Sequence, residues 1–203
     1  RVSQLHFGGG TPNFLRLSDW NAIFAKLRER FEFTADAEIS VELDPMYLPE
    51  GYLAHLRSLG MGRVSFGVQD VTPQVLEAVN RPQDISRIKA VVAESRALGY
   101  SSVNIDLIYG LPLQTPTTFD RTLDDILALQ PDRLSVFSYA HVPWMKPSQK
   151  IFEHRNQLPV PEGKLAMFAL AHERLTQAGF LDVGLDHFAR PGDELALALR
   201  EGT

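Results

Sequence analysis

The sequence predicts an α/β fold built on a mostly parallel sheet. Short apolar runs alternate along the chain with stretches in which apolar residues recur at helical spacing. The strand-like runs start roughly 25–50 residues apart, as repeated strand–helix–strand units with right-handed crossovers require. No linker, internal repeat or low-complexity segment interrupts the 203 residues, so a single domain is expected.

The expected strands are short runs rich in β-branched and aromatic residues. They cover residues 2–7, 37–43, 63–68, 102–108, 133–139 and 180–185.

The expected helices lie between these runs and carry start and stop signals. Ser18 caps an amphipathic stretch that runs to Phe31, and leucines 53, 56 and 59 lead into Gly60. Later helices run from Asp84 to Gly99, from Thr115 to Gln130, and over leucines 165 and 175 to Gly179. The segment 142–161, with four prolines, predicts an ordered loop or lid.

Composition excludes several classes of protein. The net charge of −5 and the absence of a Lys/Arg cluster argue against a protein that functions mainly by binding nucleic acid or an anionic membrane. Neither a bilayer-spanning apolar run nor a signal peptide is visible. Without cysteine the chain has no disulfide, thiolate metal site or thiol nucleophile. Because it opens without Met, directly into a strand, it reads as a piece of a longer protein.

Polar groups or glycine turns follow each expected strand. Because the carboxyl ends of parallel strands share one face, we expect these groups to gather there. They are Gly8–Gly9–Gly10–Thr11, Glu42 with Asp44, Gln69 with Asp70, Asp106 with Gly110, the run Ser138–Tyr139–Ala140–His141, and Asp186 with His187. Taken one at a time, each is equally explained as a strand-ending or helix-capping residue.

Each of these groups suggests its own chemistry. The glycine run lets backbone N–H groups approach a ligand such as a carboxylate or amino-acid moiety, although a plain tight turn remains the alternative. Glu42 and Asp106 are acids on otherwise apolar strands, where burial is expected. Because a buried acid is rarely tolerated unpaired, a cation or ribose hydroxyls should face them. Arg81 suits a ligand carboxylate, or is a surface arginine.

Three common site types lack their signatures. The glycine run has neither the lysine of a P-loop nor Rossmann spacing. The six histidines, among them His141 and His187, lack metal-ligand spacing, and no G-x-S-x-G run is present. No metal site is therefore expected within the chain, and no catalytic residue is assigned.

Several strings of the chain together resemble radical S-adenosylmethionine enzymes of the coproporphyrinogen oxidase group. They are Leu5-His6-Phe7-Gly8-Gly9-Gly10-Thr11-Pro12, Gly67-Val68-Gln69-Asp70, Asn80-Arg81-Pro82-Gln83, Asn104-Ile105-Asp106-Leu107-Ile108-Tyr109-Gly110-Leu111-Pro112 and Leu134-Ser135-Val136-Phe137-Ser138-Tyr139-Ala140-His141. The resemblance covers essentially the whole chain and implies a partial (β/α)6 barrel of the radical-SAM type, open, with parallel strands.

The resemblance also implies a function. The group consists of cytoplasmic enzymes that oxidatively decarboxylate two propionates of coproporphyrinogen III to vinyl groups, giving protoporphyrinogen IX in anaerobic haem biosynthesis. It works through a 5′-deoxyadenosyl radical and uses a 4Fe–4S cluster and two molecules of S-adenosylmethionine. An electron donor or acceptor protein is a further implied partner, and the full-length protein is expected to be a monomer that binds neither nucleic acid nor membrane.

Carried over position by position, the resemblance makes eight residues cofactor contacts. They are Gly9, Gly10, Thr11, Glu42, Gln69, Arg81, Asp106 and Ala140. It also implies that the three cluster cysteines and the first strand lie before Arg1 and that a C-terminal region lies beyond Thr203, so residues 1–203 alone should be inactive.

A haem-binding, chaperone-like paralogue is the alternative reading, with His141 or His187 as a haem ligand. The runs Tyr139–Trp144 and Gly184–Ala189 resemble the oxidase more closely than this paralogue.

Overall fold

Strands and helices alternate from the first residues onward in the computed structural model, which describes residues 1–155 and 157–202. Within these residues seven strands form one sheet, in the order β1-β2-β3-β4-β5-β7-β6. The chain separates into two compact units. The first comprises Arg1–Gly67 and Ser86–Ile105, and the second comprises Val68–Ile85 and Asp106–Thr203.

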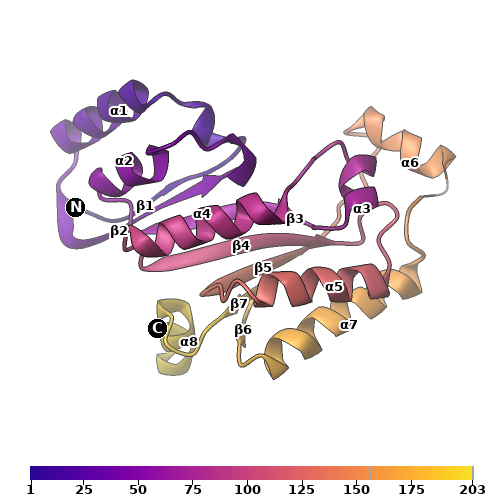
Figure 1. Cartoon of the computed structure of the whole chain (residues 1–203). Coiled ribbons are helices and arrows are strands. Elements are labelled where there is room, and N and C mark those ends of the chain that lie inside the picture. Colours follow the sequence, from indigo (N-terminus) through magenta and orange to yellow (C-terminus); the bar gives the residue numbers. More distant parts are fainter. Residues whose placement is uncertain (156, 203) are drawn as a thin grey trace. The chain divides into compact units, whose positions relative to one another are not determined.

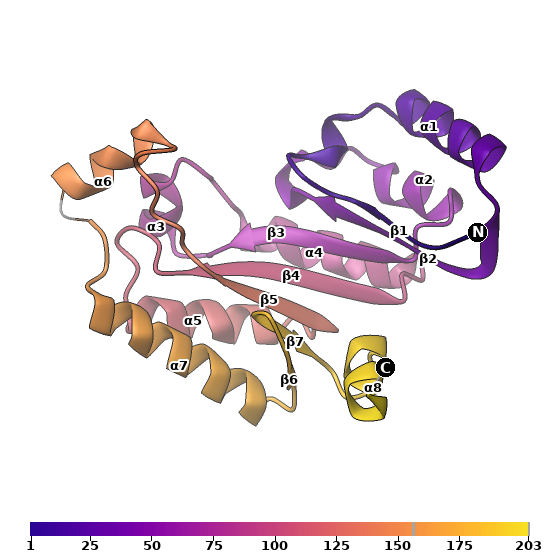
Figure 2. The ribbon, with the colours of Figure 1, turned by 180° about the vertical axis from the view of Figure 1, so that it is seen from behind.

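The first unit is a parallel sheet covered by helices. Its elements are β1 (Val2–Phe7), η1 (Pro12–Phe14), α1 (Leu17–Arg30), β2 (Phe33–Leu43), η2 (Pro45–Tyr47), α2 (Tyr52–Ser58), most of β3 (Arg63–Gln69), α4 (Ile85–Ala97) and the start of β4 (Ser102–Tyr109). Strand β2 pairs in parallel with both β1 and β3. Helices α1 and α2 lie on the same side of β1 and β2 (Figures 1 and 2).

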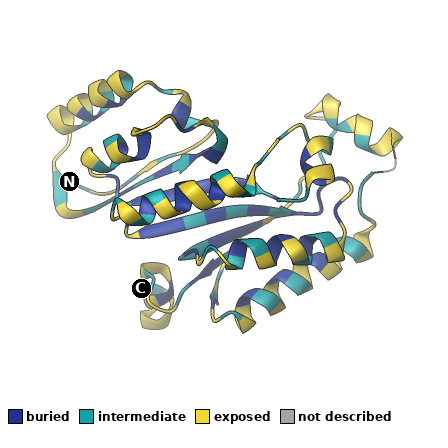
Figure 3. Ribbon diagram, in the orientation of Figure 1, coloured by how far each residue is buried: buried dark blue, intermediate teal, exposed yellow. Residues whose placement is uncertain are grey.

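Aromatic side chains fill the space between α1 and this sheet. Phe7 of β1 contacts Trp20 and Phe24 of α1, with ring centroids 4.9 and 5.6 Å away. The buried Trp20 indole N–H donates to the Tyr52 hydroxyl at 2.6 Å, and that hydroxyl donates to the Leu15 carbonyl. Alternation along β1 and β2 therefore leaves the side chains at the even-numbered positions, which include most of the polar ones, on the opposite face. Buried and partly exposed residues alternate along the second half of β2 (Figure 3).

The second unit contains the ends of β3 and β4 and the rest of the chain. Its own elements are α3 (Pro73–Ala78), α5 (Pro116–Leu127), β5 (Arg133–Ser138), η3 (Pro147–Gln149), α6 (Lys150–His154), α7 (Pro161–Gln177), β6 (Leu181–Gly184), β7 (His187–Ala189) and α8 (Glu194–Glu201). Helices α5 and α7 run side by side (Figures 1 and 2), joined by ion pairs from Arg174 to Asp120 and Asp124.

The prediction for residues 180–185 was wrong in one respect. This run forms β6, which turns back into β7, and β7 pairs antiparallel with both β5 and β6. The turn is made by Gly184, Leu185 and Asp186, all with positive φ. Strand β6 therefore runs in the same direction as β5, but the prediction did not include β7, which lies between them. Asp186 and His187 lie beside Val136 and Ser135, within the length of β5 and not beyond its end, so the strand-end argument does not apply to them.

Smaller differences concern element boundaries. Arg16, not Ser18, is the N-cap of α1, and its backbone N–H donates to Asp19 at 3.0 Å. The predicted loop at 142–161 contains η3 and α6. Thr115 caps α5 as predicted, accepting the Thr118 N–H at 3.2 Å. No helix in the described part of the chain has the length and apolarity to cross a membrane.

Candidate functional site

The glycine run after β1 forms an open turn in the first unit. Gly9 and Gly10 have φ values of +78° and +84°, which L-residues rarely adopt, and a side chain on either would point into open space. Gly8 is different, because a Cβ there would lie 2.7 Å from His6 Nε2 and 2.9 Å from the Glu42 carboxyl group. Two glycines are therefore required by backbone conformation and the third by lack of room.

Glu42 lies beside this turn, on the polar face of the sheet. Its Oε2 accepts the Gly9 N–H at 3.3 Å, and its Oε1 lies 3.3 Å from Nε2 of His6. The other ring nitrogen of His6 lies 2.8 Å from the Ser40 hydroxyl. The Glu42 side chain is 45% exposed, so the carboxylate is not the buried acid that the sequence suggested, and it is open to a ligand.

Asn13 fixes the glycine turn against the end of β2. It is 7% exposed, and its amide donates to the carbonyls of Asp44 and Tyr47 at 3.1 and 2.7 Å while its oxygen accepts the Asp44 N–H at 3.0 Å. These three bonds tie η1 to η2 and so hold Thr11, which immediately precedes η1. The sequence reasoning missed Asn13, whose available signal was an asparagine three residues after the glycine run.

Gln69 ends β3 in the second unit with an unusual backbone. Its φ is +71°, in the left-handed region that is costly for a residue other than glycine. The next residue, Asp70, is fully buried. Its carboxylate accepts hydrogen bonds from the Thr72 N–H at 2.6 Å, the Thr122 hydroxyl at 3.0 Å and the Gln114 amide at 2.6 Å. Asp70 thus anchors the chain directly after the strained residue.

Gln114 carries this network to the turn after β4. Its oxygen accepts the N–H groups of Gly110 and Leu111 at 2.6 and 3.1 Å, and its amide also donates to the Ile108 carbonyl. The loops after β3 and β4 are therefore joined through Asp70 and Gln114. Asp106 lies in β4 four residues before Gly110 and is half-buried.

A further set of contacts joins the end of β5 to the same turn. The Tyr139 N–H donates to the Tyr109 carbonyl at 2.8 Å, and Lys164 donates to the Tyr139 carbonyl at 2.7 Å. The Lys164 stem passes Gly110 so closely that a Cβ there would lie 2.8 Å from its Cε. Burial raises the pKa of the Tyr139 hydroxyl above its ordinary value. The exposed Ala140 follows, its carbonyl accepting the Gln149 amide at 3.1 Å.

Arg81 lies beside a small pocket after α3. The pocket has a volume of about 290 Å³ and is lined by Pro73, Leu76, Glu77, Asn80, Arg81, Pro82 and Gln83. Asn80, with a φ of +52°, turns the chain so that Arg81 lies beside the end of α3. There the Arg81 N–H donates to the Leu76 carbonyl at 2.9 Å.

The two histidines considered as ligands already have protein partners. His141 Nε2 lies 2.9 Å from Glu153, and His187 Nδ1 lies 3.1 Å from the buried Ser135 hydroxyl. Throughout the described ranges, no three side chains of His, Cys, Asp or Glu are grouped to hold a metal ion.

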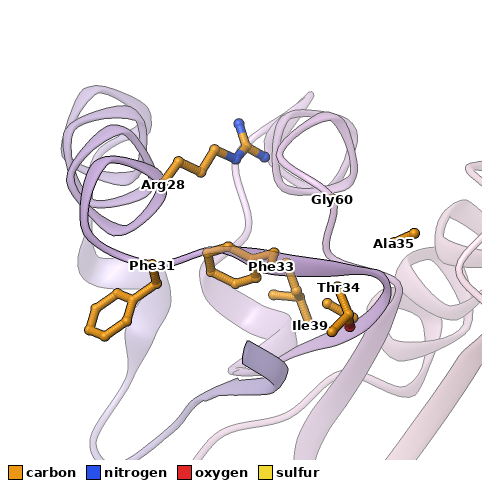
Figure 4. A pocket seen from close by; sticks show the side chains of 8 residues that line it. Arg28, Phe31, Phe33, Thr34, Ala35, Ile39 and Gly60 are labelled. Atoms are coloured by element: carbon orange, nitrogen blue, oxygen red, sulfur yellow. The ribbon is translucent and has the colours of Figure 1, made fainter. Parts of the chain in front are cut away.

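A larger pocket in the first unit is unrelated to these groups. It has a volume of about 480 Å³ and is shown in Figure 4. It lies where β2 begins, beside Phe31, Phe33 and Thr34, whereas the glycine turn and Glu42 lie at the opposite ends of their strands. It contains none of the predicted site residues.

The predicted residues thus divide between the units. Gly9, Gly10, Thr11 and Glu42 belong to the first, where the Gly9 N–H contacts Glu42 directly. Gln69, Arg81, Asp106 and Ala140 belong to the second, where hydrogen bonds join the loops after β3, β4 and β5.

Comparison with known proteins places this arrangement in context. Residues 1–126 match the family described as the Radical SAM superfamily. The chain is 49% identical over 201 residues to the oxygen-independent coproporphyrinogen III oxidase of Escherichia coli, and 46% identical over 205 residues to that of Pseudomonas aeruginosa. These alignments cover 99% and 100% of the chain, but only 44% of either relative.

Solved structures agree. The solved structure of the Escherichia coli coproporphyrinogen III oxidase, described as a radical SAM enzyme, matches with a TM-score of 0.95 over 99% of this chain and 46% of that one. A radical S-adenosylmethionine methyltransferase from Kitasatospora setae is 16% identical and matches with a TM-score of 0.57, over 69% of this chain and 28% of that chain. The predicted fold class, α/β of the radical-SAM type, is confirmed.

Proposed function

The chain belongs to the Radical SAM superfamily, and we propose that it binds S-adenosylmethionine in the oxidation of coproporphyrinogen III. The observation that carries the proposal is the similarity to the coproporphyrinogen III oxidase of Escherichia coli. The chain is 49% identical to that enzyme over 99% of its own length, and the solved structure matches with a TM-score of 0.95. Because the chain spans less than half the length of these relatives, the activity of the whole oxidase belongs to the proposal.

The groups around the glycine turn suit the amino-acid end of S-adenosylmethionine. Nothing lies within 4 Å of the positions that side chains at Gly9 and Gly10 would occupy, so a ligand can approach the backbone closely. The half-exposed Glu42 carboxylate is an acceptor for the ligand's ammonium group. We assign Gly9, Gly10, Thr11 and Glu42 to this role.

The second unit supplies the other proposed contacts. The half-buried Asp106 suits ribose hydroxyls, and the guanidinium of Arg81 suits a carboxylate. Gln69 and the Ala140 backbone complete the set. Gln69 ends β3, and the loop after it is held by the bond from the Thr72 N–H to Asp70. Ala140 follows the end of β5 by two residues, and its carbonyl accepts the Gln149 amide. Positioning of the cofactor is the contribution that these residues make.

When bound, S-adenosylmethionine would supply a 5′-deoxyadenosyl radical for removal of one hydrogen atom from a propionate side chain. Loss of carbon dioxide and transfer of the one remaining electron to an acceptor would then leave a vinyl group. The 4Fe–4S cluster that this chemistry requires does not fit the donors of this chain, because such clusters take thiolate ligands and the sequence has no cysteine. We therefore propose that its ligands lie outside these residues. We also propose that the full-length enzyme uses two molecules of S-adenosylmethionine and exchanges electrons with a partner protein. It is further proposed to be a monomer in the cytoplasm.

The competing haem-binding function makes a different prediction for the same chain. Its two candidate ligands, His141 and His187, are engaged by Glu153 and Ser135, which disfavours it. Titration by calorimetry with S-adenosylmethionine and by absorbance with haem tests both functions. We expect saturable binding of S-adenosylmethionine and no Soret shift typical of an axial histidine. Haem binding without S-adenosylmethionine binding would overturn the proposal.

A further inference from the structure

We propose that His6 is a positioning residue that orients the Glu42 carboxylate toward the ammonium group of S-adenosylmethionine. The inference rests on the proposed function and adds to it a residue that the motif comparison did not assign. Its basis is the contact between the ring of His6 in β1 and the carboxylate of Glu42 in β2.

The register of the two strands brings these groups together. His6 pairs with Ser40, so Glu42 lies two residues further along the same face of β2. The imidazole then bridges two side chains of β2, with Nδ1 at 2.8 Å from the Ser40 hydroxyl and Nε2 at 3.3 Å from Glu42 Oε1. The ring is held at both nitrogens, which fixes its plane.

The chemistry of the partners determines the tautomer. A carboxylate can only accept, so the nitrogen facing Glu42 must carry the hydrogen, and in the neutral ring Nδ1 then accepts from Ser40. Glu42 consequently has one oxygen engaged by His6 and the other by the Gly9 N–H. Both bonds are long, and each carboxylate oxygen has a further lone pair for a ligand ammonium.

Gly8 supports the same conclusion independently. Its φ is not in the left-handed region, unlike those of Gly9 and Gly10, so backbone conformation does not require glycine there. A Cβ would instead approach His6 Nε2 and Glu42 Oε2 at 2.7 and 2.9 Å, which would push the two side chains apart. The third glycine of the run leaves space for the contact between His6 and Glu42.

Two amide substitutions at His6 separate its two hydrogen bonds. In His6→Gln the side-chain amide reaches the place of Nε2 and still donates to Glu42. In His6→Asn it reaches only the place of Nδ1, so the bond to Ser40 is kept and the bond to Glu42 is lost. Both variants are neutral and polar, so a difference in affinity between them does not arise from a difference in charge.

The test measures the affinity of the chain for S-adenosylmethionine by calorimetry. We expect His6→Asn to weaken binding about five- to tenfold, the net effect of losing one intramolecular hydrogen bond, and His6→Gln to stay within about twofold of the wild type. In a Glu42→Gln background the difference between the two variants should disappear. Binding of 5′-methylthioadenosine, which lacks the ammonium group, should not change in either variant.

Three results would overturn the proposal. The affinities of His6→Asn and His6→Gln could be equal, the His6→Asn effect could persist in the Glu42→Gln background, or 5′-methylthioadenosine could lose affinity to the same extent. In each of these the proposed function would stand, because the wild type would still bind S-adenosylmethionine. A wild-type chain that bound neither ligand would overturn both.

Discussion

Asp106 carries the most direct expectation for a single side chain. Asp106→Asn removes the charge that we assign to ribose hydroxyls, so S-adenosylmethionine binding should weaken by about 1–3 kcal/mol, the scale for a hydrogen bond to a charged group. Calorimetry on the chain measures this. Asp36→Asn, an exposed position on β2, is the matched control and should bind normally. Equal affinities in the two variants would remove Asp106 from the site.

Tyr100 gives an expectation for alkaline pH. It is 4% exposed, its hydroxyl donates to the Leu53 carbonyl at 3.0 Å, and burial raises its pKa well above the ordinary value. The folded state then holds this proton more tightly than the unfolded state. Its contribution to the free energy of unfolding is complete below pH ~10 and is lost as pH rises toward the folded pKa.

Urea unfolding at pH 8 and at pH 10.5 tests this expectation. The wild type should lose more stability over the interval than Tyr100→Phe does. Tyr47→Phe, in which a ring that is 57% exposed loses its hydroxyl, should behave like the wild type. The same loss in all three proteins would contradict the assignment.

The loops after β3 and β4 depend on a polar network that sequence reasoning did not find. Asp70 was noted only as a residue at a strand end. Its partners Thr122 and Gln114 are 52 and 44 residues away along the chain, so no local pattern could link them. The glycine turn, by contrast, was predictable, because positive φ at Gly9 and Gly10 is a local property of the residue type.

Asp70→Asn should destabilise the fold through this network. Three donors face the carboxylate, and an amide presents a donor to one of them, which leaves a buried polar group unsatisfied at a cost of about 1–3 kcal/mol. The midpoint of urea unfolding should fall accordingly. Thr122→Val, which removes one donor and leaves the carboxylate its other two partners, should cost less. A midpoint unchanged in Asp70→Asn would show that the network contributes nothing to stability.

The hairpin of β6 and β7 shows where local patterning misleads. Its first strand has the composition of the preceding parallel strands, so the run 180–185 was predicted to continue their pattern. Strand β6 does run in the same direction as β5, but β7 lies between them, because the chain reverses after β6. Two residues other than glycine in that turn, Leu185 and Asp186, adopt positive φ. That conformation is not evident from residue type, since leucine seldom adopts it.

The order of strands in the whole sheet has a consequence for solution behaviour. Within the described residues strand β1 stands at one end of the sheet and is paired along one edge, with β2, so its other edge is available for pairing with another strand. We expect the chain to associate as its concentration rises, measured by size-exclusion chromatography. Ser3→Lys, at an exposed position of β1, places a charge on this edge and should reduce association. A wild type that stays a monomer at every concentration would refute the edge argument.

Coproporphyrinogen III oxidation by a chimera tests the proposed function of the whole chain most directly. The chain would replace the 201 residues to which it aligns in the Escherichia coli oxidase, whose remaining residues stay in place. Under anaerobic conditions, with S-adenosylmethionine and a reductant, we predict that the chimera forms protoporphyrinogen IX and that Asp106→Asn within it lowers the rate. A folded chimera that leaves coproporphyrinogen III unchanged would contradict the proposal.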